Sequence, residues 1–464
     1  MKMRFQFVHF VQVLLGLALP FAAHATVGIR LTTSDIVPAP FPILVDRTEK
    51  FESDHTFVQL FNPKYNTAFI KVVNRNVAVI LPARLNSDTL MEALIKIRAA
   101  RTFGALDVTV VTPKTLRETV MEGKGLSELN LEGLMAVAGA DHVNEKGHLR
   151  KISEAKPVKN LVTQAEYWVG GTNHPQLLSE VAFSLGKEVF SLAQLQAIPG
   201  QLKGRSLYWI TANTPPINEN FCRTLGEIQW LEKQGAVVHL ISPYLPYARS
   251  DKPEFDVGVT TQGRLVADLI ESVGTQGITV VRAHAPQSLG FFKIHAEEIS
   301  GRVTLVKTLK DLDVDSVVSP DAGFQKDATK VQQDLSAASG GKPVGLVVMN
   351  KQRNSEGKET LQGGTGLENI QDKTVVIIDD ETSSGGTLNQ VAQAIQAYKP
   401  KSIFAVVTHL AGTGQKGLDS PFIEKLIVTD TVPVKVENAK LKVLSIAPEL
   451  VEKIKEYESN RELH

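Results

Sequence analysis

The sequence predicts an α/β fold of doubly wound, mainly parallel sheets. Two observations carry this prediction: short unbroken apolar runs rich in β-branched residues recur along the chain, and amphipathic stretches of helix length separate them. Strands of a parallel sheet are covered on both faces, so they read as continuous apolar runs. Of the 464 residues, 43% are hydrophobic and 22% charged. This composition fits globular domains and excludes a disordered or fibrous chain.

The apolar runs give the predicted strands in chain order. They are residues 77–81 (VAVIL), 108–111 (VTVV), 237–241 (VVHLI), 278–281 (ITVV), 316–318 (SVV), 344–348 (VGLVV), 374–378 (TVVII) and 403–407 (IFAVV). Each run is bounded by turn-forming or helical segments, as expected of alternating strands and covering helices.

Part of the chain repeats itself. Residues 74–113 and 203–243 each contain a strand, a turn with an Asn, a long helix and a second strand that ends in Thr/Ser-Pro, and an offset of 130 residues separates the two copies. This period is too long for a solenoid and indicates a duplicated half-domain. Chance likeness between two ordinary α/β units is the alternative. The charged, weakly patterned residues 146–163 are predicted to link the copies.

The first 25 residues have the layout of a secretory signal peptide. Lys2 and Arg4 precede an apolar run at 13–23, and Ala23-His24-Ala25 forms a small-x-small cleavage site. We therefore expect an exported protein, periplasmic or secreted, without a stable membrane span after processing. A retained anchor or a buried N-terminal helix is the alternative. The single cysteine, Cys222, cannot form a disulfide within the chain and is predicted to lie in the core of the repeat helix.

The balance of charges also limits the possible partners. Lys and Arg together number 50, as do Asp and Glu, so the formal net charge is zero. A chain without basic excess is a poor candidate for general nucleic-acid binding, and we expect no nucleic-acid partner.

Residues 374–387 (TVVIIDDETSSGGT) are predicted to bind a phosphate and a sugar. A buried strand ends in Asp379 and Asp380, and a turn of small residues leads into a helix. Unpaired N–H groups at a helix start attract anions, and glycines let the backbone approach them. The acids suit sugar hydroxyls or Mg²⁺ instead. The residues expected to contact the phosphate are Ser383, Ser384, Gly385, Gly386 and Thr387.

This loop resembles the phosphoribosyl-binding loop of type I phosphoribosyltransferases and of ribose-phosphate pyrophosphokinases (PRPP synthetases). Other segments, in the right order, resemble the pyrophosphokinases alone. They are residues 170–186 (GGTNHPQLLSEVAFSLG), 213–220 (NTPPINEN), 241–252 (ISPYLPYARSDK), 284–292 (HAPQSLGFF), 317–323 (VVSPDAG), 351–353 (KQR), 428–433 (VTDTVP) and 444–454 (LSIAPELVEKI). The resemblance covers about residues 166–458.

The resemblance implies a fold, a reaction and a set of site residues. The family has two similar phosphoribosyltransferase-like domains and transfers the β,γ-diphosphoryl group of ATP to the 1-hydroxyl of ribose 5-phosphate with Mg²⁺, as a dimer or larger ring. Lys351 and Arg353 match its catalytic basic pair, and residues 354–366 would form a mobile lid. The remaining matches are Arg249 and Asp251 for ATP, His284 and Asp321 for Mg²⁺, and the loop above for ribose 5-phosphate.

The chain departs from the family pattern where ATP and metal would bind. Arg282 stands where members carry an Asp, and Ser250 and Ser383 replace a Gln and an Asp. The family's Phe-x-Asp-Gly-Glu element for ATP falls on residues 190–196 (FSLAQLQ), which contain no acid. Residues 51–60 (FESDHTFVQL) resemble that element better, so the N-terminal copy could supply it.

The expected domains follow from the repeat and the resemblance. Residues 1–25 form the leader, 26–145 a degenerate copy of the family's N-terminal domain, and 146–163 a linker. Residues 164–310 form a complete N-terminal domain, and 311–464 the phosphoribosyltransferase-like C-terminal domain. Three functions stay open: a pyrophosphokinase with full or impaired activity; a non-catalytic phosphosugar- or nucleotide-binding or interaction protein of the same fold; and an exported phosphoribosyltransferase.

Overall fold

The computed structural model describes twelve stretches of the chain. They are residues 26–30, 76–81, 84–102, 105, 107–112, 116, 120–122, 129–145, 148–152, 167–253, 261–353 and 359–462. The predicted leader 1–25, residues 51–60 and most of the predicted linker lie outside them. The chain divides into two compact units, one of residues 1–122, 131–155 and 252–260, the other of residues 123–130, 156–251 and 261–464.

The first unit is built on a sheet of order β1-β2-β4-β6-β7, parallel except for the last pair. Helix α2 buries Leu90, Leu94 and Ile97, whose spacing places them on one helix face. The elements of this unit are β1 (Thr26–Arg30), β2 (Asn76–Ile80), β3 (Arg84–Asn86), α2 (Ser87–Thr102), β4 (Asp107–Thr112), β5 (Val120–Glu122), α3 (Leu131–Ala138), β6 (His142–Glu145) and β7 (His148–Lys151).

The second unit contains two sheets, and the first has the order β13-β12-β11-β10-β8-β9 with every pair parallel. Its elements are β8 (Trp168–Thr172), α4 (Pro175–Leu185), β9 (Val189–Phe190), α5 (Leu192–Gln196), η4 (Pro199–Gln201), β10 (Ser206–Thr211), α6 (Ile217–Lys233), β11 (Val237–Ser242), α7 (Gln262–Ser272), β12 (Gly277–Val281), η5 (Pro286–Phe291) and β13 (His295–Ile299).

The two units share a strand–helix–strand element at the offset found in the sequence. β2, α2 and β4 begin at residues 76, 87 and 107, and β10, α6 and β11 begin 130 residues later, at 206, 217 and 237. The neighbouring strands also follow the same order, β1-β2-β4-β6 in one sheet and β8-β10-β11-β12 in the other. Cys222 on α6 is fully buried, which confirms its prediction as a core residue.

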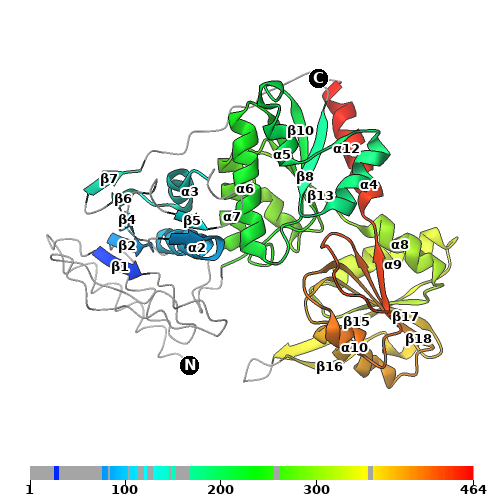
Figure 1. The fold of residues 1–464 in the computed structure, drawn as a ribbon. Helices are drawn as coiled ribbons and strands as arrows, with labels where there is room; N and C mark the ends of the chain where they lie inside the picture. Colours follow the sequence, from blue (N-terminus) through cyan, green and yellow to red (C-terminus); the bar gives the residue numbers. More distant parts are fainter. Residues whose placement is uncertain are drawn as a thin grey trace, which may run out of the picture. The chain divides into compact units, whose positions relative to one another are not determined.

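The second sheet of this unit has the order β16-β15-β14-β17-β18-β19-β20, and only β16 is antiparallel. Helix α10 packs on one face with Leu388, Val391 and Ile395, and helices α8 and α9 pack on the other (Figure 1). The predicted doubly wound fold is confirmed. The elements are α8 (Arg302–Asp311), β14 (Ser316–Ser319), α9 (Gln325–Ala338), β15 (Gly345–Arg353), β16 (Glu359–Thr365), η6 (Leu367–Asn369), β17 (Thr374–Thr382), α10 (Gly386–Gln396), β18 (Ser402–Leu410), α11 (Gln415–Leu418), β19 (Lys425–Thr429) and β20 (Leu441–Leu444).

The last helix, α12 (Ala447–Glu462), packs against the first sheet of this unit rather than the second. Leu450, Val451 and Ile454 share a core with Val181 of α4, beside which α12 runs in Figure 1. The end of the chain therefore completes a core that begins some 280 residues earlier.

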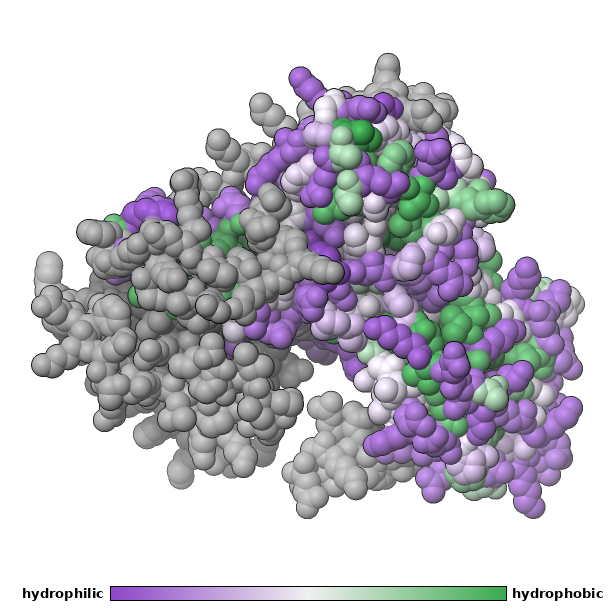
Figure 2. Space-filling view, in the orientation of Figure 1, coloured by the Kyte–Doolittle hydropathy of each residue, from purple (hydrophilic) through white to green (hydrophobic). Residues whose placement is uncertain are grey.

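The surface of the described residues is mainly polar. In Figure 2 hydrophilic residues dominate the visible described face, and apolar residues interrupt it in separate groups. Phe183 and Val303 are the most exposed large hydrophobic residues among those described. No helix in the described part is both long and apolar enough to cross a membrane.

Candidate active site

The predicted phosphate loop joins β17 to α10 at the carboxyl edge of the second sheet. Its strand is buried as far as Ile378, so the acids that follow are held rigidly at the sheet edge. Gly385 adopts φ 79°, a left-handed conformation that favours glycine, and its amide donates to the Thr382 hydroxyl at 3.1 Å. Ser383 and Ser384 are exposed. The loop thus presents two exposed serines at the start of a helix, an arrangement that suits an anion.

Asp380 forms an ion pair with His284, which follows β12 in the other sheet of the unit. Their Oδ2 and Nδ1 atoms lie 2.5 Å apart. Burial alone would raise the pKa of Asp380, but the hydrogen bond and the charge of His284 lower it. The pKa of His284 is raised, mainly by the hydrogen bond to Asp380. The pair therefore joins the predicted metal residue to the predicted sugar-binding acid.

The pKa of Asp379 is shifted in the opposite direction from that of Asp380. Burial, followed by the charge of Asp380 and a weaker effect of Asp321, raises its pKa above the ordinary value. Asp321 lies at the end of β14, where its Oδ1 accepts from the Phe324 amide at 3.1 Å. Three carboxylates thus crowd the carboxyl edge of this sheet, and a cation would relieve their repulsion.

These residues fit Mg²⁺ only in part. The described residues contain no group of three His, Cys, Asp or Glu side chains that could enclose a metal. Mg²⁺ commonly binds through one or two carboxylates together with substrate phosphates. The crowded acids, with Asp321 among them, match that second pattern, so the metal would enter with the nucleotide.

Further polar residues reach the site from the loop after β11. The Tyr244 hydroxyl hydrogen-bonds Glu381, and burial raises the pKa of both groups. The Arg249 guanidinium acts on Glu381 and His284 by charge, and Asp251 acts on His284 in the same way. The structure therefore brings the predicted ATP residues Arg249 and Asp251 to the same edge as the predicted metal and ribose residues.

Arg282, the departure from the family pattern, is already paired. Its Nη2 lies 2.8 Å from Oδ2 of Asp327 on α9, its side chain is 10% exposed, and its guanidinium lies 5.2 Å from the ring centroid of Phe324. Its positive charge is thus balanced within the protein.

The predicted catalytic pair lies at the end of a strand. Lys351 and Arg353 lie at the end of β15, which pairs with β16 through a register shift after Met349. Residues 354–366 were expected to form a mobile lid, and residues 359–365 of that range form a strand, because they continue the hydrogen-bonded ladder of β15.

The segment that should carry the ATP element is a short helix. Ser191 caps α5 and forms a capping box with Gln194, and Phe190 stacks on Trp168 with centroids 4.6 Å apart. The polar groups of this segment are thus used for local structure. The substitute proposed from the sequence, residues 51–60, lies outside the described residues.

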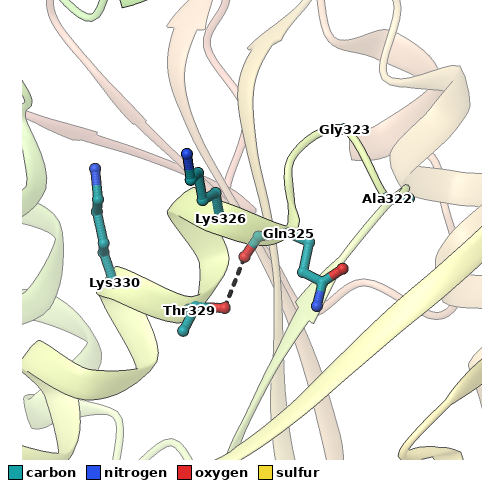
Figure 3. Close-up of a pocket in the computed structure, with 6 residues that line it drawn as sticks. All are labelled: Ala322, Gly323, Gln325, Lys326, Thr329 and Lys330. Atoms are coloured by element: carbon teal, nitrogen blue, oxygen red, sulfur yellow. Dashed lines mark hydrogen bonds between the residues drawn. The ribbon is translucent and has the colours of Figure 1, made fainter.

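An open depression lies at the start of α9, just after Asp321. Figure 3 shows Lys326 and Lys330 pointing to the same side of the helix, and the Thr329 hydroxyl donating to the carbonyl oxygen of Gln325 at 2.8 Å. The depression is lined by Ala322, Gly323, Gln325, Lys326, Thr329 and Lys330. All but Thr329 are exposed, so the depression has a positive rim without a buried polar floor.

Sequence reasoning missed several residues of this site. Tyr244 and Glu381 lie within the motifs 241–252 and 374–387, so their place in those motifs could have identified them. His409 on β18 could not have been found, because only the fold brings it to the Arg282 carbonyl oxygen, 3.0 Å from its Nε2. Asp327 on α9 is likewise brought to the site only by tertiary structure.

Two family models match the second unit. The N-terminal domain of ribose phosphate pyrophosphokinase matches residues 168–274, and the phosphoribosyl transferase domain matches residues 262–442. A ribose-phosphate pyrophosphokinase from Oceanobacillus iheyensis is 30% identical over 297 residues, which cover 61% of this chain and 90% of the relative. The relative from Aquifex aeolicus is 30% identical over 302 residues, covering 62% and 94%.

A solved structure agrees with these matches. The phosphoribosylpyrophosphate synthetase from Mycobacterium smegmatis superposes with a TM-score of 0.54 and 25% identity, and the match covers 64% of this chain and all of that one. Sequence, site and fold lead to the same conclusion: this chain belongs to the ribose-phosphate pyrophosphokinase family.

Proposed function

We propose that the protein transfers the diphosphoryl group of ATP to ribose 5-phosphate and forms PRPP and AMP. One observation carries the proposal. In a member of this family, the acid pair near the end of β17, which leads into the small-residue loop, meets His284 and Arg249 from the other sheet of the same unit. A sugar phosphate and a nucleotide can therefore share one edge.

Residues of different charge bind different parts of the two substrates. The small-residue loop before α10 takes the 5-phosphate through backbone N–H groups and hydroxyls. Asp379 and Asp380 accept hydrogen bonds from the ribose hydroxyls and hold C1 toward the nucleotide. Arg249 and Asp251 bind ATP, and Asp321 and His284 hold Mg²⁺, which neutralises phosphate charge when bound.

The transfer itself is a displacement at phosphorus. The O1 oxygen of ribose 5-phosphate bonds to the β-phosphorus as the bond from that phosphorus to the α–β bridging oxygen breaks. AMP leaves with the bridging oxygen, and the hydroxyl proton passes to solvent. Lys351 and Arg353, on the β15–β16 hairpin, supply positive charge to the transferring group, since phosphoryl transfer depends on positioning and charge neutralisation.

One assay tests the reaction. The protein is incubated with ATP, Mg²⁺ and ribose 5-phosphate, and AMP and PRPP are measured in equal amounts. Lys351→Ala should lower the rate about a hundredfold, because one stabilising cation is lost. If the wild-type protein makes no more AMP than this variant, the proposed enzymatic activity is rejected. Calorimetric binding of ribose 5-phosphate by such an inactive protein would then support the binding function.

ATP recognition is proposed to involve the N-terminal copy. Residues 190–196 carry no acid, and residues 192–196 of this segment form helix α5, so residues 51–60 would supply the missing element. Phe51→Ala/Asp54→Ala should then weaken nucleotide binding in calorimetry without weakening ribose 5-phosphate binding. Unchanged nucleotide affinity contradicts this role and leaves the first unit a packing domain.

Assembly and destination are also proposed. We expect a homo-oligomer, as the family resemblance implies, and sedimentation of the purified protein measures its mass. We expect export by residues 1–25, which N-terminal sequencing of the protein recovered from the producing cell tests: a chain beginning at Thr26 supports cleavage, and one beginning at Met1 contradicts it.

A further inference from the structure

A second loop, residues 411–417, which includes the first residues of α11, runs beside the phosphate loop and has no part in the function proposed above. Three backbone hydrogen bonds join the two. The amides of Ala411, Gly414 and Lys416 donate to the carbonyl oxygens of Thr382, Ser383 and Ser384 at 2.9, 2.8 and 2.8 Å. The second loop is therefore fixed in register along the whole phosphate loop.

Glycines on both sides make this contact possible. A Cβ on Gly385 would lie 2.5 Å from the amide nitrogen of Gly417, and a Cβ on Gly412 would lie 2.6 Å from the carbonyl oxygen of Ser383. Real side chains do not tolerate such distances, so only glycine fits at these points. The two backbones touch directly, which fixes where the next side chains emerge.

Lys416 emerges beside the start of α10. Its Cδ lies 3.7 Å from the place where a Cβ on Gly386, the first residue of that helix, would be. The side chain is exposed, and its ammonium group is two bonds beyond Cδ. The positive charge can therefore reach the first turn of α10, where the phosphate is expected.

We infer that Lys416 is a further substrate-binding residue that contacts the 5-phosphate of ribose 5-phosphate; this inference rests on the proposed function. The electrostatics of the site call for such a group. The phosphate is a dianion close to neutral pH, its loop offers uncharged donors, and Asp379, Asp380 and Glu381 lie just upstream. A lysine supplies a mobile point charge that offsets these carboxylates.

Calorimetry with ribose 5-phosphate tests the inference directly. Lys416→Ala should weaken binding about tenfold, the loss expected for one charge-assisted contact, and Lys416→Arg should restore most of it. Lys425→Ala is the matched control, because Lys425 is an exposed lysine at the amino end of β19, the opposite edge of the same sheet. It should bind like the wild type. In the assay, Lys416→Ala should raise KM for ribose 5-phosphate and leave kcat close to the wild-type value.

The outcomes separate this inference from the proposed function. If the wild type binds ribose 5-phosphate and the Lys416→Ala variant binds it equally well, the inference is overturned and the proposed function is unaffected. If the wild type makes no AMP, the function fails, and titration with inorganic phosphate decides the role of Lys416. If Lys416→Ala weakens phosphate binding and Lys425→Ala does not, the result supports the contact between Lys416 and the phosphate. If all three proteins bind phosphate equally, or none binds it detectably, the contact is overturned.

Discussion

Arg282 holds a backbone conformation that residues with a side chain rarely adopt, with φ 47°. Such a conformation costs on the order of 1–3 kcal/mol and persists only where the surroundings fix it. Four contacts do so: the amide donates to Ile299 at 2.8 Å, the carbonyl accepts from His409, the guanidinium pairs with Asp327, and the same group lies over Phe324. Arg282 thereby holds the turn that carries His284 against the second sheet.

The ion pair between Arg282 and Asp327 should be strongly coupled. Asp327→Ala leaves a mostly buried guanidinium without its carboxylate, so we expect the free energy of unfolding to fall by about 2 kcal/mol. Arg282→Met/Asp327→Ala should cost less than the sum of the single changes. Urea unfolding of the four proteins measures the coupling, and a coupling below about 0.5 kcal/mol contradicts the pair's role.

His409 should make stability depend on pH. It is buried, and burial lowers its pKa to about 4, despite the hydrogen bond to the Arg282 carbonyl. Its Nε2 faces the Arg282 carbonyl oxygen, which can only accept, so Nε2 carries the proton of the neutral ring, and Nδ1 lies 2.8 Å from the Thr431 hydroxyl oxygen. The unfolded state, with an ordinary pKa of about 6.5, binds more protons between these values. The contribution of neutral His409 to the free energy of unfolding is therefore fully present above about pH 6.5 and is lost as the pH falls toward 4.

Urea unfolding at several pH values checks this dependence. Between about pH 6.5 and pH 4, protonation of His409 in the unfolded state should lower the free energy of unfolding by up to about 1.4 kcal/mol for each pH unit of decrease. His409→Gln keeps an N–H donor but does not titrate, so its stability should fall less steeply with pH. Parallel curves for the two proteins would show that His409 is not the group responsible.

At the scale of elements, the site depends on the contact between the phosphate loop and residues 411–417. Gly385→Ala would place a methyl group against Gly417 and force alanine into a left-handed conformation. We expect the free energy of unfolding to fall by about 1–2 kcal/mol and ribose 5-phosphate binding to weaken more than tenfold, because the loops separate. Gly200→Ala is the control, since Gly200 has open space around it. Equal binding by both variants in calorimetry contradicts the expected role of loop contact.

At the scale of the whole molecule, α12 ties the end of the second unit to its beginning. Leu450, Val451 and Ile454 are buried in the core that includes α4 and β10. A fragment limited to the predicted domain 164–310 would expose that core to water. We expect the fragment to lack a cooperative urea transition and a native near-ultraviolet circular dichroism spectrum, and fusion of residues 445–462 to its end should restore both. Cooperative unfolding of the bare fragment would show that α12 is dispensable for this core.

Much of the fold could be predicted because its signals are local. The unbroken apolar runs at 374–378 and 403–407 lie in β17 and β18, since central parallel strands must be apolar on both faces. The phosphate loop was equally readable, because acids, small residues and a helix start follow one another in sequence. The β15–β16 hairpin was missed, since its second strand, ETLQGGT, has the polar, glycine-containing composition of a loop.

Local sequence features therefore predict the sheets, the loop chemistry and the family, because periodicity and motifs are properties of neighbouring residues. Tertiary structure alone decided which separate motifs share one edge. It paired His284 with Asp380, balanced Arg282 with Asp327, and laid residues 411–417 along the phosphate loop. These contacts join residues about 30 to 100 positions apart, and they arise because the carboxyl ends of parallel strands meet at sheet edges, a relation no local pattern records.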